Sequence, residues 1–447
     1  MASHRASSTT GLVLLLASLT PHLTLAEPIP GGPKCLWNPA GPLHSRERTS
    51  CPLAVDDTSP PSALDASPWL QPLKCRHSRT QSGRSSSIVE TSTNGEAVRC
   101  VYSTHDFRGA GLSLVTRPET AANIVGLGGL DDLEASPMSL ERVYGRFSTG
   151  PSISKSGRPA YAVEDLPGKG KGVIARRRIV KGEVFMVDYP ALLVEAGMMS
   201  ELTPGMRKGV VKLAFENLPR ETGAEVLDLA KSTGGDEVLD AFTTNSCNVF
   251  MADGEAHLGL FPEVSRMNHA CEPNAFYRFS PRSLTVEVAA YRDIEPGEEI
   301  NINYAYLGMP YKERRKYLQD SWNFNCTCHL CLADTATREG SDARRMAIAN
   351  TRNALTDAQK AGRHGEAIEK AGELVGLCEE EGLFPLVAGF YDSMARGYLE
   401  IGDVEDAQVY AELALGGWLE YYGEDSVKVE GGLELLDAIG RRRDKQG

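Results

Sequence analysis

The residues best suited to chemistry lie in one short stretch, 265–274, with the sequence SRMNHACEPN. Asn268 offers an amide with two donors and one acceptor, and His269 offers an imidazole and a backbone carbonyl. Pro273 and Asn274 predict a turn, because proline presets φ and asparagine tolerates unusual backbone angles. Polar groups at this density beside the apolar run 258–262 indicate a ligand site, although a loop at the end of a core segment would show the same pattern.

Three further stretches carry residues of a similar kind. Residues 168–172 read GKGKG between strand-like segments, and glycines there let the backbone approach a ligand closely. Residues 298–304 alternate polar and apolar side chains, as a strand should, and end at Tyr304. Residues 326–331 read CTCHLC, a spacing found in metal sites. Taken alone, the glycine stretch would be a hairpin turn with solvated lysines, and Tyr304 would be a core tyrosine at a strand end.

These four stretches, in this order, resemble the SET-domain lysine methyltransferases, and most of all the SMYD-type branch with its fungal relatives. The resemblance covers residues 158–333, with a weaker likeness toward the C-terminus. In the SMYD branch a zinc-binding MYND module interrupts the domain. Residues 176–246 contain no cysteine here, so that module is missing.

The resemblance implies S-adenosylmethionine as the methyl donor. It assigns Asn268 and the His269 backbone to the cofactor's amino-acid and adenine portions, and it makes Tyr304 the catalytic residue, in contact with the cofactor. The other cofactor-binding residues that it implies are Lys169, Gly170, Lys171, Gly172, Trp322 and Phe324. Trp322 stands where the branch more usually has tyrosine, so Phe324 is the better candidate for stacking on adenine. Cys247, followed by Phe250, stands where an aromatic side chain often lines the lysine channel, which leaves the degree of methylation open.

By the same resemblance, Cys271 joins Cys326, Cys328 and Cys331 around one zinc ion. Four thiolates close a tetrahedral site with no position for water, so the ion would be structural. With Zn–S bonds of about 2.3 Å, the sulfur atoms are expected about 3.8 Å apart. His329 is expected beside the cluster, either solvated or behind a ligand.

The predicted fold class is α+β. The resemblance implies a SET domain of small β-sheets, with a β-clip and a pseudoknot, at residues 158–306; a helical insert of two or three helices falls at 200–243. A zinc-binding post-SET segment is expected at 307–333, and an all-α, tetratricopeptide-like domain at 341–440. Within it, the segments 362–367 and 402–407 each follow one predicted helix and start another, at a period slightly above the usual value of about 34 residues. A plain helical bundle is the alternative.

The N-terminus predicts a signal peptide at residues 1–26. Arg5 precedes the apolar run 11–19, and the small residue Ala26 precedes Glu-Pro. Residues 27–157, with the four cysteines Cys35, Cys51, Cys75 and Cys100, are predicted to form a partly disordered region. An even cysteine count behind a signal peptide suggests two disulfides, and idle thiols are the alternative. The predicted location is therefore the secretory pathway, with the cytoplasm or nucleus as the alternative.

The net charge and the distribution of apolar residues argue against two classes of protein. The net charge of −13 on 447 residues does not favour nucleic-acid binding, and no run after the leader is apolar enough to span a bilayer. The predicted function is methyl transfer from S-adenosylmethionine to a lysine side chain of a protein substrate, with the acidic C-terminal helices as a possible surface for a protein partner. One alternative is a non-catalytic scaffold of SET domain and helices. Another is a zinc-stabilised lumenal protein with an unrelated role.

Overall fold

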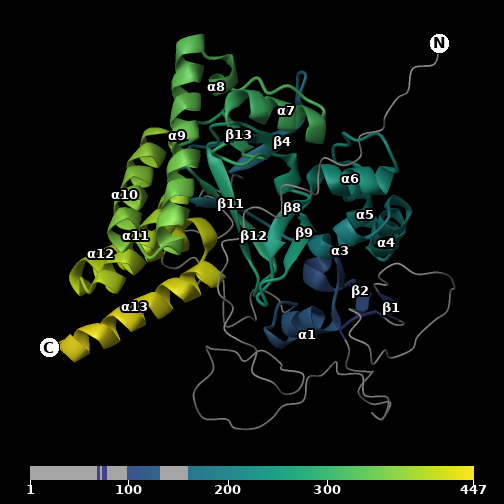
Figure 1. The fold of residues 1–447 in the computed structure, drawn as a ribbon. Coiled ribbons are helices and arrows are strands. Elements are labelled where there is room, and N and C mark those ends of the chain that lie inside the picture. Colours follow the sequence, from purple (N-terminus) through teal and green to yellow (C-terminus); the bar gives the residue numbers. More distant parts are fainter. Residues whose placement is uncertain (1–67, 71–72, 78–97, 131–159, 447) are drawn as a thin grey trace, which may run out of the picture.

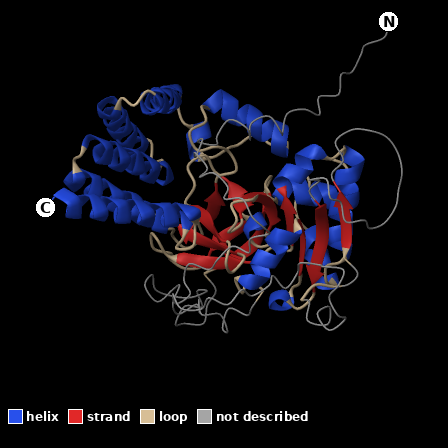
Figure 2. Ribbon diagram, turned by 60° about the horizontal axis from the view of Figure 1, so that its bottom comes forward, coloured by secondary structure: helices blue, strands red, loops and turns tan. Residues whose placement is uncertain are grey.

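The structure is a computed structural model that describes residues 68–70, 73–77, 98–130 and 160–446. Three β-sheets occupy the centre, and helices cover them on two sides (Figure 1, Figure 2). This arrangement agrees with the predicted α+β class. Among the described helices, none is both long enough and apolar enough to cross a membrane. The predicted signal peptide lies outside the described residues.

The largest sheet has six strands and includes part of the N-terminal region. Its strands, in spatial order, are β1 (Lys74–His77), β2 (Val98–Thr104), β3 (Leu112–Thr116), β7 (Leu192–Glu195), β9 (Ala256–Leu260) and β8 (Cys247–Phe250). β3 runs parallel to β7, and every other neighbouring pair is antiparallel. Because β2 and β3 join β7 through one continuous ladder, residues 98–116 are part of the same sheet as the central domain. The 3₁₀ turn Phe107–Gly109 and helix α1 (Pro118–Gly126) complete this described segment.

Two smaller sheets frame the stretch with the most polar chemistry. One has the order β10 (Asn268–His269), β13 (Glu299–Ile302), β5 (Gly170–Ala175) and β4 (Tyr161–Leu166). The other has the order β11 (Ala275–Ser280), β12 (Thr285–Ala290) and β6 (Val184–Asp188). β10 pairs with β13 in parallel, and Asn268 lies opposite Asn301. The glycine-rich strand and the Asn-His pair therefore flank the strand that leads to Tyr304.

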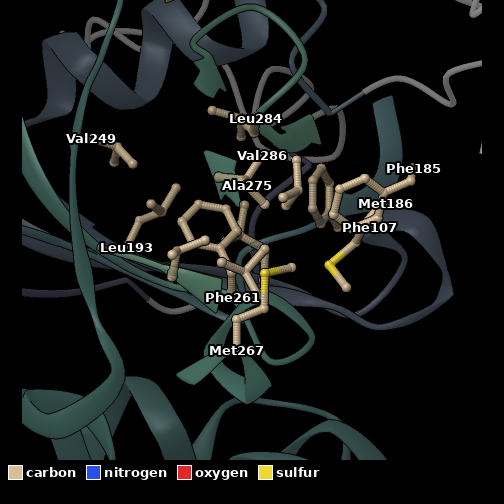
Figure 3. Packing of buried hydrophobic residues seen from close by; sticks show 14 of the residues in the cluster. Phe107, Phe185, Met186, Leu193, Val249, Phe261, Met267, Ala275, Leu284 and Val286 are labelled. Atoms are coloured by element: carbon tan, nitrogen blue, oxygen red, sulfur yellow. The ribbon is translucent and has the colours of Figure 1, made fainter. Parts of the chain in front are cut away.

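The central core anchors this region through the residue just before Asn268. Met267 is fully buried beside Phe261, and the side chains of Phe185, Met186 and Val286 belong to the same cluster (Figure 3). Burying a side chain of this size stabilises the fold by about 1.5–3 kcal/mol. The packing of Met267 therefore fixes where the polar residues after it emerge.

The helical insert contains four helices, α3 (Ala196–Glu201), α4 (Pro204–Glu216), α5 (Arg220–Leu227) and α6 (Glu237–Asn245). Three of them, α4, α5 and α6, occupy the range 200–243, where two or three helices were predicted. The short α3 begins before that range, and its six residues are too few to show a helical period. The side chains of Val211, Ala214 and Val226 pack against Leu192 and Leu260 of the six-stranded sheet. The insert consequently covers one face of that sheet.

The chain beyond Tyr304 is helical. Its helices are α7 (Tyr311–Trp322), α8 (His329–Leu332), α9 (Thr335–Lys360), α10 (His364–Glu380), α11 (Val387–Ile401), α12 (Val404–Tyr422) and α13 (Val427–Gln446), with a 3₁₀ turn at Phe384–Leu386. Another 3₁₀ turn, Val264–Arg266, lies earlier in the chain, just before β10. From α9 onward each helix packs on the next, which is the arrangement of consecutive hairpins. Gly362 and Gly402 adopt positive φ between the paired helices, as the two predicted turns require. The tetratricopeptide-like character stays a prediction.

The C-terminal helices dock on the three-stranded sheet. The ring of Phe276 lies 5.0 Å from that of Tyr421, centroid to centroid. Arg278 donates hydrogen bonds to the carbonyls of Leu419 (3.2 Å) and Glu420 (2.8 Å). Aromatic packing and these hydrogen bonds together join the end of α12 to β11.

Candidate functional site

A cleft of about 860 Å³ lies where the glycine-rich hairpin, the Asn-His pair, the insert and the segment after α7 meet. Its lining includes Lys169, Gly170, Lys171, Asp228, Ser232, Thr244, Asn268, His269, Glu299, Tyr304, Trp322 and Phe324. Every residue predicted to hold the cofactor therefore lines this one cleft, with the exception of Gly172. A Cβ on Gly172 would lie 2.3 Å from Leu166 Cδ1 and 2.9 Å from Asn268 Nδ2. Gly172 thus makes room for Asn268 and is not itself a lining residue.

The side chain of Asn274 connects the predicted turn to the strand beside the cleft. Its side chain is buried, and its Nδ2 donates to the Glu299 carbonyl at 2.9 Å. Its Oδ1 accepts from the Asn301 backbone N–H at 2.8 Å. The turn that follows Asn268 and His269 is therefore tied to the strand that precedes Tyr304.

The polar end of the cleft is built from alternating charges. Asn268 Nδ2 donates to Glu299 Oε1 at 3.0 Å and to the Lys171 carbonyl at 3.2 Å. Lys169 pairs with Glu299 at 2.6 Å, and Lys171 pairs with Asp228 at 2.5 Å. The hydrogen bond from Lys171 lowers the pKa of Asp228, so this exposed carboxylate is charged at neutral pH. Glu299 and Asp228 were not among the predicted site residues. Glu299 lies in the alternating strand before Tyr304, whereas nothing in the sequence around Asp228 marks it as functional.

Aromatic rings line another part of the cleft. The Tyr304 ring lies 5.2 Å from Trp322 and 6.4 Å from Phe324, centroid to centroid, and the Phe324 contact is edge-on. Trp322 Nε1 donates to the Thr244 carbonyl of the insert at 2.8 Å. The Tyr304 hydroxyl donates to the Met267 carbonyl at 2.5 Å. Burial raises the pKa of Tyr304 above its ordinary value, so the phenol stays neutral.

The insert forms a wall of the cleft because one buried carboxylate organises its loop. Asp240 accepts from the backbone N–H groups of Ser232 (3.0 Å), Thr233 (2.9 Å) and Gly234 (2.7 Å), and from the Thr244 hydroxyl at 2.9 Å. Burial alone raises the pKa of this carboxyl, but the hydrogen bonds lower it to about 2. A permanently charged Asp240 thus holds residues 232–234 in place.

His269 was expected to act through its backbone, but its side chain also makes contacts in the site. Its Nδ1 accepts the Tyr304 backbone N–H at 3.0 Å, and its Nε2 lies 3.3 Å from Cys271 Sγ. Burial lowers the pKa of His269 to about 4, so the ring is neutral at pH 7. Because Nδ1 is the acceptor, the proton resides on Nε2 and points at the sulfur. The imidazole therefore connects the cysteines with the backbone of Tyr304.

The four predicted ligand cysteines converge behind the aromatic wall. The sulfur atoms of Cys271, Cys326, Cys328 and Cys331 all lie within 4.8 Å of one another. Cys271 Sγ lies 3.8 Å from that of Cys326 and 3.5 Å from that of Cys331. The predicted convergence is confirmed, and these four thiols could hold a metal ion. The His329 side chain is 91% exposed, in agreement with its exclusion from the ligand set.

A buried arginine accompanies the cysteines. Arg314 of α7 is 1% exposed, and its Nη1 donates to the Met309 carbonyl at 2.7 Å. Although burial lowers its pKa, the nearby sulfurs of Cys271 and Cys331 raise it above the usual value. A permanent positive charge here would balance a cluster of thiolates.

The remaining cysteines lie apart from this cluster. Cys75 and Cys100 form a disulfide that joins β1 to β2, whereas Cys35 and Cys51 fall outside the described residues. Burial raises the pKa of the Cys247 thiol to about 12, which suits a packed side chain and not a nucleophile. Phe250 is 58% exposed on β8.

Comparison with known proteins agrees with this site. The family model of the SET domain matches residues 170–305, from the start of β5 to the residue after Tyr304. The chain is 28% identical to histone-lysine N-methyltransferase set5 of Schizosaccharomyces pombe, over 60% of this chain and 81% of set5. It is 34% identical to histone-lysine N-methyltransferase SMYD3 of Mus musculus, over 40% of this chain and 42% of SMYD3. It is 30% identical to N-lysine methyltransferase SMYD2 of Gallus gallus, over 42% of this chain and 47% of SMYD2.

The fold and the matched segment define a SET-domain protein. Residues 170–305 carry a SET domain, and the relatives that the chain resembles are lysine methyltransferases of the set5 and SMYD types. The chain spans less than half the length of these two SMYD relatives.

Proposed function

We propose that this protein transfers a methyl group from S-adenosylmethionine to the ε-amine of a lysine in a protein substrate. The observation that carries the proposal is the position of Tyr304 within the matched segment. Its ring lines the same cleft as Asn268 and the two lysines of the glycine-rich hairpin. A single cleft thus offers both polar groups for an amino acid and aromatic rings with a fixed phenol.

The residues of the cleft fit the chemistry of this cofactor. Lys169 and Lys171 supply cations for its carboxylate, and Glu299, which already accepts from Asn268, supplies an anion for its ammonium group. Phe324 and Trp322 supply apolar faces for adenine. When bound, S-adenosylmethionine supplies an electrophilic methyl group.

The chain's own contribution to transfer is orientation and desolvation. The hydrogen of the Tyr304 hydroxyl points at the Met267 carbonyl, which leaves the oxygen lone pairs free to accept from an amine N–H. The unperturbed lysine pKa is about 10.4, and an apolar site lowers it because burial disfavours the charged form. Holding a neutral amine in line for attack is then the main source of rate.

We further infer that the four cysteines bind zinc as a closed structural site. Four sulfur donors without a carboxylate or an open position favour Zn²⁺ over other common cations. The ion would tie residues 326–331, and through them Phe324, to Cys271. The acidic C-terminal helices remain a candidate surface for a protein partner.

The test uses the whole chain, because β2 and β3 lie inside the six-stranded sheet. Calorimetry with S-adenosylmethionine should show one site per chain. Core histones and a library of lysine peptides, with the labelled cofactor, should yield methyl-lysine by mass spectrometry. Cofactor binding without any transfer to these acceptors would leave only the scaffold alternative, and absence of both would overturn the proposal.

A further inference from the structure

Beyond the cleft, the C-terminal helices reach the segment that follows Tyr304. Residues 303–310 connect β13 to α7, and 305–310 are the part of this connection that follows Tyr304. α9 runs beside this connection (Figure 1) and holds it with side chains at several points. Tyr311 N–H donates to Asp342 Oδ1 at 2.7 Å, and Arg352 bonds the Tyr306 hydroxyl.

The central contact is made by Arg345, whose side chain is fully buried. Its Nε lies 2.7 Å from Oε1 of Glu381, whose side chain is 3% exposed. A buried ion pair contributes little net stability over an apolar pair, because desolvation offsets the attraction. Net stability therefore does not account for the Arg345–Glu381 pair. Its geometry indicates another role.

Glu381 fixes the direction of the Arg345 guanidinium. The carboxylate also receives the Ser341 hydroxyl and Arg344 Nε, the latter at 2.7 Å from Oε2. With Glu381 held by three side chains of α9, the free end of Arg345 is directed away from the helices. Its Nη1 donates to the Leu307 carbonyl and lies 3.4 Å from the Met309 carbonyl.

The Met309 carbonyl is also the acceptor for Arg314, the buried arginine beside the cysteine cluster. The Met309 carbonyl is thus shared by Arg314 of α7 and Arg345 of α9. On the other side of Tyr304, its own N–H is held by His269. The backbone on both sides of the catalytic candidate is therefore restrained by buried side chains.

We propose that Arg345 is a positioning residue for Tyr304, acting through the carbonyls of Leu307 and Met309. This inference rests on the proposed function, in which Tyr304 orients the acceptor amine. A displacement of about 1 Å at a reacting group can lower the rate by about 100-fold. The C-terminal helices would then contribute to turnover without contacting cofactor or acceptor.

The first experiment compares three variants of the full chain. Arg345→Lys retains a cation for Glu381 but lacks the fork that reaches Leu307, and Arg345→Met lacks both. Arg344→Met is the matched control, since it removes the other arginine from the same carboxylate and has a partly exposed side chain. With core histones as acceptor, we expect kcat to fall at least tenfold in both Arg345 variants, with the cofactor Kd within about threefold of wild type. Arg344→Met leaves the contacts of Ser341 and Arg345 with Glu381 in place and should therefore keep the wild-type kcat.

A variant with both buried charges removed, Arg345→Met with Glu381→Met, guards against misfolding, because an apolar pair can replace a buried ion pair. Wild-type kcat in this folded variant would overturn the inference. A second readout does not depend on methyl transfer: hydrogen exchange of the peptide that spans 303–309 should be faster in each Arg345 variant than in Arg344→Met. Equal exchange would overturn the positioning role even if the wild type transferred no methyl group, which separates this failure from failure of the proposed function.

Discussion

The Tyr304 backbone donates a hydrogen bond to the ring of His269, whose other nitrogen faces Cys271. Two hydrogen bonds, both made by the His269 ring, therefore connect Cys271 of the cysteine cluster to Tyr304. A change at the metal site should reach the cleft through this imidazole.

Substitution of a cluster cysteine should remove the metal. In Cys271→Ser we expect zinc content to fall from one ion per chain to far below one, because a neutral hydroxyl replaces a thiolate. The melting temperature should fall as well, since binding energy of the ion is folding energy. Zinc measured by mass spectrometry on the purified chain checks this. Cys378→Ala, at a buried free cysteine in the C-terminal helices, is the control and should retain a full complement. Retention of one zinc in Cys271→Ser would contradict the assignment.

Substitutions of Tyr304 and Asn268 should change different quantities, kcat in the first case and the cofactor Kd in the second. Tyr304→Phe removes the hydroxyl that orients the amine, so kcat should drop by about 100-fold or more while the cofactor Kd stays within about twofold. Asn268→Ala removes a polar group from the cofactor end, and the loss of about one hydrogen bond predicts a Kd about tenfold higher. Calorimetry and single-turnover rates separate the two effects. If both variants lose affinity equally, Tyr304 is a structural residue.

The Asp240 carboxylate should make the free energy of unfolding depend on pH. Its pKa is about 2 in the folded chain, below the ordinary value of 3.8. The unfolded chain therefore binds more protons between these values, and the stabilisation is complete above pH 4 and is lost as the pH falls toward 2. The shift corresponds to about 2 kcal/mol.

Asp240→Asn should accordingly lower the free energy of unfolding by about 2 kcal/mol at neutral pH, and by less near pH 3. Urea titrations across this range measure the difference. Glu237→Gln, in the same helix with a side chain that is 66% exposed, should behave like wild type. A difference that stays constant down to pH 2 would show that the Asp240 charge is not the source.

We propose that the N-terminal leader directs the chain into the secretory pathway, and the Cys75–Cys100 disulfide supports this because such bonds persist in oxidising compartments. Peptide mapping without reduction should recover the linked pair from chain purified from its native cells. Breaking it with Cys75→Ser should cost about 3 kcal/mol, the chain-entropy value for a loop of roughly this length. A diffuse cytosolic or nuclear signal from a tagged chain, with an intact N-terminus and free thiols, would overturn the proposal.

The sequence alone determined the parts of the site that lie within short motifs. The spacing of Cys326, Cys328 and Cys331 constrains where three sulfurs can lie, because few bonds separate them. The polar–apolar alternation before Tyr304 marked a strand, and the strand is present as β13. The glycines at 168 and 170 adopt the positive φ that a tight hairpin needs.

Only the tertiary structure decided which distant elements complete these motifs. Periodicity reports which face of an element is buried, but not which other element covers it. Nothing local to Asp228 predicts its pairing with Lys171, and nothing local to residues 98–116 predicts their place beside β7. In the sequence, nothing distinguishes Arg345 from the other charged residues of a predicted helix. Its burial, and its reach to the Leu307 carbonyl, arise because the C-terminal helices pack against the segment after Tyr304, and that packing depends on the shape of both surfaces together.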